Sequence, residues 1–318
     1  MNNNSQQPLV SFIVPFYNLP AELVSECIDS ILSLSLRKEE REIILIDDGS
    51  DDNTVIDILD DRKNDVTYIR QNNAGLSAAR NTGLKIATGR YIQFVDSDDR
   101  LITEFYNLCL DIVRYKDPDM VMFDMTCTDK THMKNNSAEP VDGAQYMRHN
   151  NLRATACGYI FSRNILGDLR FTPNMLHEDE EFTPQLVLRC EKVFNLDATA
   201  YYYRKRESSI TNSPNKRSII KRLDDVERII IHLDQIADMM TAGDKQAMRR
   251  RVAQLTMDYI YNIVKLTRSG KQLESRIKRL GARGLFPLPD RNYTLKYTVF
   301  RHISKNAVVR KILKTAWG

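Results

Sequence analysis

Residues 91–100 read YIQFVDSDDR. The first five residues are mostly apolar, as in a buried β-strand, and the second five include Asp96, Asp98 and Asp99. Two like unit charges about 4 Å apart repel each other by about 1 kcal/mol in water, and by more inside a protein. Paired aspartates at a strand end suit a hard divalent cation, because Mg²⁺ and Mn²⁺ prefer oxygen ligands. The alternative is a solvated acidic turn in which an aspartate caps the next helix, and an isolated D-x-D does not separate the two.

The residues before this stretch predict a parallel β-sheet. Short apolar runs at 9–14, 42–46 and 66–69 alternate with segments that carry apolar residues at helical spacing, and 91–95 is the fourth run. We expect Pro15 to end the first strand. Strands that alternate with helices in this way indicate βαβ units, in which ligands bind beyond the carboxyl ends of the strands. Three of the four ends carry polar residues, namely Tyr17 and Asn18, Asp47 and Asp48, and Asp96 and Asp98.

The second part of the chain has a different pattern. Further strands are expected at 120–123 and, as two short strands, within 193–203, with a polar loop at 126–139. From about Arg217 onward, apolar residues recur at helical spacing and glycine is sparse, which is typical of packed helices. We therefore predict an α/β fold class with a mixed, mostly parallel central sheet. The α/β domain would span 1–215 and a helical region would span 216–318.

Composition argues against several classes of protein. A net charge of +4 over 318 residues is too small to imply a nucleic-acid partner. The five cysteines are scattered and form no C-x-x-C pair, so neither a zinc site nor a disulfide framework is indicated. No apolar stretch is long enough to span a bilayer, and the start MNNNSQQP lacks the basic and apolar regions of a signal peptide. We therefore expect a cytoplasmic protein.

Six motifs, in order along the chain, resemble those of the family 2 glycosyltransferases, which are inverting enzymes with the nucleotide-sugar-binding A-type (GT-A) fold. Most of these motifs are weak singly, but six in order are highly specific. The resemblance covers roughly Val10 to Thr211 and implies that 1–215 is a GT-A catalytic domain. The motifs are SFIVPFYN, IDDGSDD, NNAGLSAARNTGL, YIQFVDSDD, HEDEEF and YYYRKRESSIT.

The resemblance implies a nucleotide site at the strand ends. Pro15 and Tyr17 would line the pocket for the base, and Asp48 would accept a hydrogen bond from it, as from the N–H of a uracil. Arg80 would approach the nucleotide, and Asp96 would face the ribose. Taken alone, the IDDGSDD segment could be only a turn, and Arg80 could be a charge on a helix surface.

The resemblance implies a reaction as well. Asp98 would hold Mn²⁺ or Mg²⁺ beside the diphosphate, and Arg204 and Arg206 would lie in a segment that closes over it. These cationic groups would stabilise the charge that grows on the leaving group. Asp179 would deprotonate the acceptor hydroxyl in a single, inverting displacement, and the neighbouring glutamates would raise its proton affinity. Alternatively, HEDEEF could be an acidic helix N-terminus, and YYYRKR an edge strand with a solvated basic face.

The function expected from this resemblance is transfer of one sugar, or a few, from a nucleotide-diphosphate sugar. The expected donor is a UDP-sugar, and the expected acceptor is a glycan or a lipid-linked precursor in cell-surface polysaccharide synthesis. The chain lacks the Q-x-x-R-W motif of the processive synthases. A sugar-nucleotide nucleotidyltransferase should show a glycine-rich loop after the first strand, where PFYNLP has none. A non-catalytic nucleotide-sugar-binding protein stays an alternative, although Asp98 and Asp179 argue against it.

The C-terminal residues raise the question of membrane contact. After Asp290 the chain holds basic and apolar residues but no acidic one. From Val299 onward the pattern predicts a helix with an apolar stripe and a basic remainder. Such a helix can lie on an anionic bilayer, where each basic residue contributes about 1 kcal/mol, and would place the protein at the inner face of the plasma membrane. The alternative, which the sequence supports equally, is that the stripe packs on the helical region and the lysines are solvated.

Overall fold

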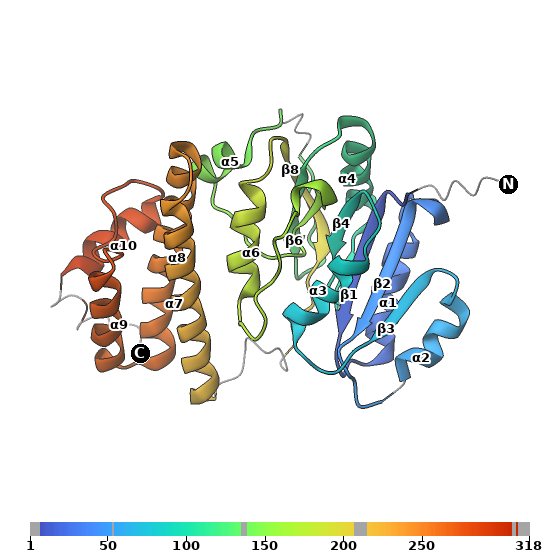
Figure 1. The fold of residues 1–318 in the computed structure, drawn as a ribbon, viewed down its shortest axis with the longest axis horizontal. Helices are drawn as coiled ribbons and strands as arrows, with labels where there is room; N and C mark the ends of the chain where they lie inside the picture. Colours follow the sequence, from blue (N-terminus) through green and yellow to red (C-terminus); the bar gives the residue numbers. More distant parts are fainter. Residues whose placement is uncertain (1–6, 53, 135–138, 207–214, 307–309, 311–318) are drawn as a thin grey trace. The chain divides into compact units, whose positions relative to one another are not determined.

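The structure, a computed structural model, describes residues 7–52, 54–134, 139–206, 215–306 and 310. It divides into two compact units (Figure 1). The α/β unit comprises Met1–Tyr146 and Arg153–Arg206, and the helical unit comprises Met147–Leu152 and Glu207–Gly318. The domain boundary expected between residues 215 and 216 stays a prediction, because residues 207–214 lie outside the described residues.

The α/β unit is built on one eight-stranded sheet with the strand order β3-β2-β1-β4-β7-β6-β8-β5. The neighbours from β3 to β4 run parallel, as do β6 and β8, and the other pairs are antiparallel. The predicted α/β class with a mixed, mostly parallel sheet is therefore confirmed. The strands are β1 (Val10–Phe16), β2 (Arg41–Asp47), β3 (Val66–Arg70), β4 (Tyr91–Phe94), β5 (Arg100–Leu101), β6 (Met120–Thr126), β7 (Tyr159–Ser162) and β8 (Val193–Tyr202).

Helices connect these strands and bury their apolar faces. Helix α3 packs closely on β1, because a Cβ at Gly83 would lie 2.3 Å from Cγ2 of Ile13. Burial of β1 and β4 on both faces explains why both strands are mostly apolar; Ser11 and Gln93 are their buried polar residues. The helices of this unit are α1 (Ala21–Leu32), α2 (Thr54–Leu59), α3 (Leu76–Ile86), α4 (Thr103–Lys116), α5 (Gly143–His149) and α6 (Glu178–Val187), with short 3₁₀ turns η1 (Lys38–Glu40), η2 (Asp60–Arg62) and η3 (Arg163–Ile165).

Two expectations about the strands were wrong. Pro15 does not end the first strand, since β1 continues to Phe16. The pairing of β1 with β4 stops at Ile13, so on the β4 side Pro15 lacks a strand partner that would need its N–H. The Pro15 carbonyl accepts a hydrogen bond from the Ser97 hydroxyl at 2.8 Å. The region 193–203 forms one strand rather than two, because β8 absorbs its irregularity in bulges against β6.

The helical unit is a set of helices that pack through apolar stripes, drawn in orange and red in Figure 1. On α7 the stripe includes Leu223, Ile230 and Leu233, all buried. A charged cluster joins two of the helices, since the buried Arg276 guanidinium donates to the exposed Asp224 at 2.8 Å and to Glu227 at 3.1 Å. The helices are α7 (Lys216–Asp238), α8 (Ala242–Thr267), α9 (Gly270–Ala282) and α10 (Leu295–Lys305).

Candidate active site

The carboxyl ends of β2, β1 and β4 lie next to one another, because these three parallel strands are neighbours in the sheet. The turns that follow β1 and β2 are joined by side chains. The Asn18 amide nitrogen donates to Asp51 at 2.7 Å, and the Asn18 backbone N–H donates to the Ser50 hydroxyl at 3.0 Å. The convergence of polar strand ends expected from the sequence is therefore present in the structure.

The two residues assigned to the base pocket differ in exposure. Pro15 is buried inside β1, and its described polar contact is the bond to Ser97. Tyr17 follows the strand and is 46% exposed, so its ring is available to stack on a planar ligand. A stacking role for Tyr17 fits this geometry, whereas the buried Pro15 is less available to a ligand.

Asp48 anchors the loop between β3 and α3. Its carboxylate accepts hydrogen bonds from the Gln71 amide at 2.7 Å, the Ala74 N–H at 3.0 Å and the Gly75 N–H at 2.7 Å. A carboxylate offers about four acceptor positions, so about one remains for a ligand. Asp48 thus has a structural task in addition to the predicted contact with a base.

Arg80 joins two distant carboxylates from the middle of α3. One terminal nitrogen donates to Asp96 at 2.8 Å and the other donates to Glu178 at 2.6 Å. The Arg80 side chain is only 4% exposed and lies over the ring of Phe171. Burial opposes its charge, but Asp96 and Glu178 outweigh that effect and hold the pKa of Arg80 above its usual range. Arg80 therefore connects the end of β4 to the start of α6.

The DSDD turn after β4 is held by cationic and polar groups from the end of β8. Nε of Arg206 lies 2.5 Å from Oδ2 of Asp98. The Arg204 backbone N–H donates to Asp99 at 2.7 Å, and its Nε donates to the Asp98 carbonyl at 3.0 Å. The predicted closure of Arg204 and Arg206 over a diphosphate would thus begin beside Asp98.

Asp99 and Tyr201 also lie at the candidate site, and neither was assigned a role from the sequence. The Tyr201 hydroxyl donates to Asp99 at 2.8 Å and accepts from the Asp96 N–H at 3.1 Å. Burial, together with the charge of Asp96, raises the pKa of Asp99 to about 8. Both residues act as positioning residues, because they fix the DSDD turn against β8. The available signals were the third aspartate of DSDD for Asp99 and the first tyrosine of the YYYRKRESSIT motif for Tyr201.

Asp179 stands in the first turn of α6, next to Glu178. Loss of hydration, followed by the charges of Glu178 and Glu180, raises the pKa of Asp179 to about 8, although Arg80 acts in the opposite direction. Oδ1 of Asp179 accepts from the Glu180 N–H at 2.9 Å. The proton affinity shifts in the direction that the neighbouring glutamates predicted. A carboxyl group with a pKa near the working pH is suited to general-base chemistry.

Comparisons with known proteins give the family. The family model "Glycosyl transferase family 2" matches residues 11–164. The uncharacterized glycosyltransferase EpsJ of Bacillus subtilis (strain 168) is 30% identical over 237 residues, which are 68% of this chain and 67% of EpsJ. The chain belongs to glycosyltransferase family 2. The protein is accordingly an enzyme of the transferase class.

Two further similarities place this glycosyltransferase among known proteins. The minor teichoic acid biosynthesis protein GgaB of Bacillus subtilis (strain 168) is 30% identical over 220 residues, which are 65% of this chain but only 24% of GgaB. The crystal structure of S. aureus TarS 1–349 in complex with UDP-GlcNAc aligns with a TM-score of 0.71 at 21% identity. It covers 96% of this chain and 92% of that one. The likeness to TarS shows that the fold is the same.

Within the described residues of the glycosyltransferase, no helix combines the length and the apolar character needed to cross a bilayer.

Proposed function

We propose that this glycosyltransferase transfers a sugar from a UDP-sugar to a hydroxyl group of a cell-surface glycan or its lipid-linked precursor, with inversion at the anomeric carbon. The observation that carries this proposal is the chain Asp96–Arg80–Glu178, in which the buried Arg80 links Asp96 of the DSDD turn to Glu178, the residue next to Asp179. A donor bound at the turn and an acceptor bound at Asp179 would then be held by one rigid assembly. The UDP-GlcNAc bound to TarS and the teichoic acid role in the name of GgaB support the donor and acceptor classes.

The side chains at the DSDD turn fit a hard divalent cation. The Asp98 carboxylate is 18% exposed, and its one described side-chain partner is a cation, the guanidinium of Arg206. A Mn²⁺ or Mg²⁺ ion held by Asp98 would supply charge stabilisation to the leaving diphosphate. Arg206 is long enough to exchange Asp98 for a phosphate oxygen, and Arg204 beside it adds a second positive charge. Asp98 would thus pair with Arg206 when the metal ion is absent and with the ion when it is bound.

The acceptor side depends on Asp179. An alcohol is a poor nucleophile until its proton is removed, and Asp179 would remove it as the new bond forms. Glu178 cannot share this task freely, because its carboxylate is engaged by Arg80 at 2.6 Å. The charge of Glu178, together with burial, raises the proton affinity of Asp179 beside it.

Binding of UDP-sugars should raise the melting temperature of the protein. A ligand that binds only the folded state stabilises it by about 2.7 kcal/mol at 100 times its Kd, which corresponds to several degrees in a chain of this size. We expect a UDP-sugar with Mn²⁺ to give the largest rise among UDP-, GDP- and dTDP-sugars, and EDTA to reduce it. Release of UDP from the same samples separates an enzyme from a binding protein. Melting curves that no nucleotide sugar shifts would rule the proposal out.

Contact with an anionic membrane is the second part of the proposal. In α10, Tyr297 and Phe300 are buried, so part of the apolar stripe packs inside the helical unit. Leu295 and Val299 stay 82% and 47% exposed, and they share one face because they are four residues apart. Some basic residues of this region are paired, since Arg310 binds Glu274 through two bonds of 3.0 Å. Residues 307–309 and 311–318 of the expected amphipathic tail lie outside the described residues.

Removal of the exposed α10 pair should abolish binding to anionic vesicles. We expect the full chain to co-sediment with phosphatidylglycerol vesicles at low salt, and Leu295→Asp/Val299→Asp to stay in the supernatant. Met239→Asp is the matched control, because Met239 is 80% exposed on the same unit and should not affect binding. Equal sedimentation of the parent chain and the double variant, or none for either, would remove this part of the proposal.

A further inference from the structure

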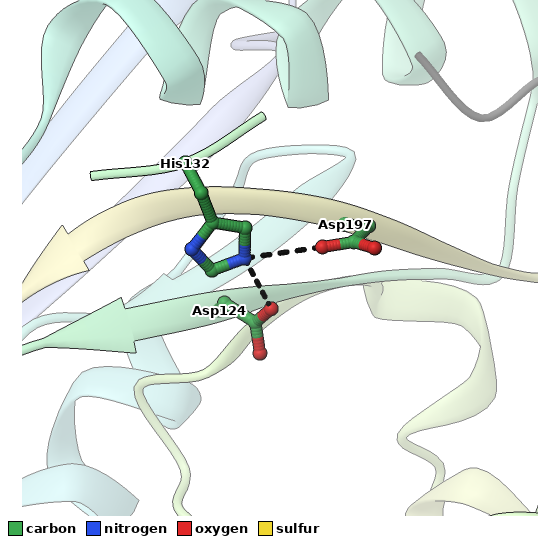
Figure 2. Close-up of side chains that lie close together, drawn as sticks. All are labelled: Asp124, His132 and Asp197. Carbon is green, nitrogen blue, oxygen red and sulfur yellow. Dashed lines mark hydrogen bonds and ion pairs between the residues drawn. The ribbon is translucent and has the colours of Figure 1, made fainter. Parts of the chain in front are cut away.

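A histidine and two aspartates meet on the α/β unit, and none of them belongs to the candidate active site. Asp124 comes from β6, Asp197 from β8 and His132 from the segment that follows β6 (Figure 2). Nε2 of His132 lies 3.0 Å from Oδ2 of Asp124 and 3.1 Å from Oδ1 of Asp197. One nitrogen and two oxygens, each a metal-ligating atom, thus lie within 4.8 Å of one another.

The backbone builds this cluster from three separate segments. The segment that carries His132 pairs with β8, since the Lys134 N–H donates to the Asp197 carbonyl at 2.9 Å and the Thr199 N–H donates to the His132 carbonyl at 3.0 Å. Between Met122 and Asp124 the β6–β8 register shifts, which places extra β8 residues opposite Asp124. Strand pairing therefore holds all three side chains, although the sequence predicted only a polar loop at 126–139.

The outer atoms of all three side chains have partners of their own. Oδ2 of Asp197 lies 3.2 Å from the Lys134 ammonium, and Oδ1 of Asp124 lies 3.7 Å from the Arg153 guanidinium. Nδ1 of His132 lies 2.9 Å from the buried Thr199 hydroxyl. Metal ligands are commonly oriented by such outer contacts, which leave the inner atoms directed at one point.

We propose that Asp124, His132 and Asp197 form a zinc site. Imidazole nitrogen and carboxylate oxygen are both zinc ligands, and the imidazole favours Zn²⁺ over Mg²⁺ or Ca²⁺. Three protein ligands leave a fourth position for water or another ligand. The bound ion would tie the 127–134 segment to β6 and β8 at a second cation site, separate from Asp98.

Zinc binding requires the lone pair of Nε2, so the imidazole proton must reside on Nδ1. The Thr199 hydroxyl oxygen can accept that proton in a hydrogen bond, and its O–H can donate to Nδ1 in the other tautomer. A protonated His132 must lose one proton to bind the ion. The alternative explanation of the same geometry is an ordinary surface ion pair between His132 and the two carboxylates, which would not bind zinc selectively.

Calorimetric titration of the nucleotide-free full chain with Zn²⁺ tests the site. We expect one zinc ion per chain, still bound by Asp98→Ala, which removes the carboxylate at the DSDD turn. His132→Gln, Asp124→Asn and Asp197→Asn should each weaken binding by at least about tenfold, and Thr199→Val by about 10–100-fold through loss of the imidazole partner. His149→Gln, at an exposed histidine on α5, is the matched control and should bind as the parent does.

X-ray absorption at the zinc K-edge identifies the atoms that coordinate the ion in the parent chain, so this test needs no variant. A first shell with one imidazole nitrogen and with oxygens at about 2.0–2.1 Å supports the site. A shell that contains thiolate, or no imidazole, overturns it. A parent chain that binds no zinc, or a folded His132→Gln that binds it as tightly as the parent, overturns the proposal as well.

Discussion

Asp179→Asn should bind a nucleotide sugar as the parent does but transfer sugar about 10²–10⁴-fold more slowly, which is the loss typical of a missing general base. Asparagine keeps the oxygen that accepts from the Glu180 N–H at 2.9 Å, so the start of α6 should be preserved. It cannot accept the proton of the acceptor hydroxyl. Release of nucleoside diphosphate measures the turnover, and calorimetry measures donor affinity.

The pH dependence of kcat/KM in the parent provides a second test of Asp179 as the general base. With a pKa of about 8, roughly a tenth of the Asp179 carboxyl groups are ionised at pH 7 in the free protein. The parent kcat/KM should therefore rise with pH and level off above about pH 8, and a profile that is flat between pH 6 and 9 would contradict the assignment.

Stability separates catalysis from folding in the Asp179→Asn variant. An unfolded aspartate has a pKa of about 3.9, and the pKa of Asp179 is about 8 in the folded state. A carboxyl group whose pKa is raised on folding favours the folded state below about pH 4, and that contribution is lost as the pH rises through 8. At pH 8 the asparagine variant should therefore be at least as stable to urea as the parent. Near-parental turnover in the variant would move the role of base to another residue, with Glu178 or Glu180 next to be tested.

Asp98→Ala should remove the dependence of nucleotide-diphosphate binding on a divalent cation. The parent should bind UDP at least about tenfold more tightly with Mn²⁺ than with EDTA, a difference of about 1.4 kcal/mol. The variant should show the same affinity in both buffers, because the carboxylate expected to hold the ion is gone. Calorimetric titration of UDP in the two buffers gives both numbers.

The variant has a second effect that a control must cover. Loss of Asp98 also removes the partner of Arg206, whose Nε lies 2.5 Å from the carboxylate, so general charge effects need to be excluded. Asp111→Ala removes an aspartate that is 57% exposed on α4 and should leave the Mn²⁺ dependence intact. Equal Mn²⁺ dependence in Asp98→Ala and the parent would show that the ion is held elsewhere or not at all.

The sequence alone predicted the elements that local patterns specify. Apolar runs at strand length and apolar residues at helical spacing depend only on near neighbours, so β1 to β4 and the helices between them were expected near their observed places. The position of polar residues at the strand ends then predicted where a ligand should bind, because parallel strands present their carboxyl ends at one edge. The glutamates beside Asp179 predicted the direction of its pKa shift for the same reason, since they are its neighbours in the chain.

Contacts between distant residues were not available from the sequence. Arg80 pairs with Glu178 across 98 residues, Tyr201 binds Asp99 across 102, and Thr199 contacts His132 across 67. Each contact depends on the strand order, on the register or on a bulge, and a shift of one residue would turn the side chain to the other face of the sheet. Local patterns in the chain were therefore enough to predict which segments become strands and helices and which strand ends carry carboxylates. The pairing of Arg80 with Asp96 and Glu178, the bond from Tyr201 of β8 to Asp99 and the position of His132 between two aspartates became visible in the fold alone, because each depends on how the whole sheet is assembled.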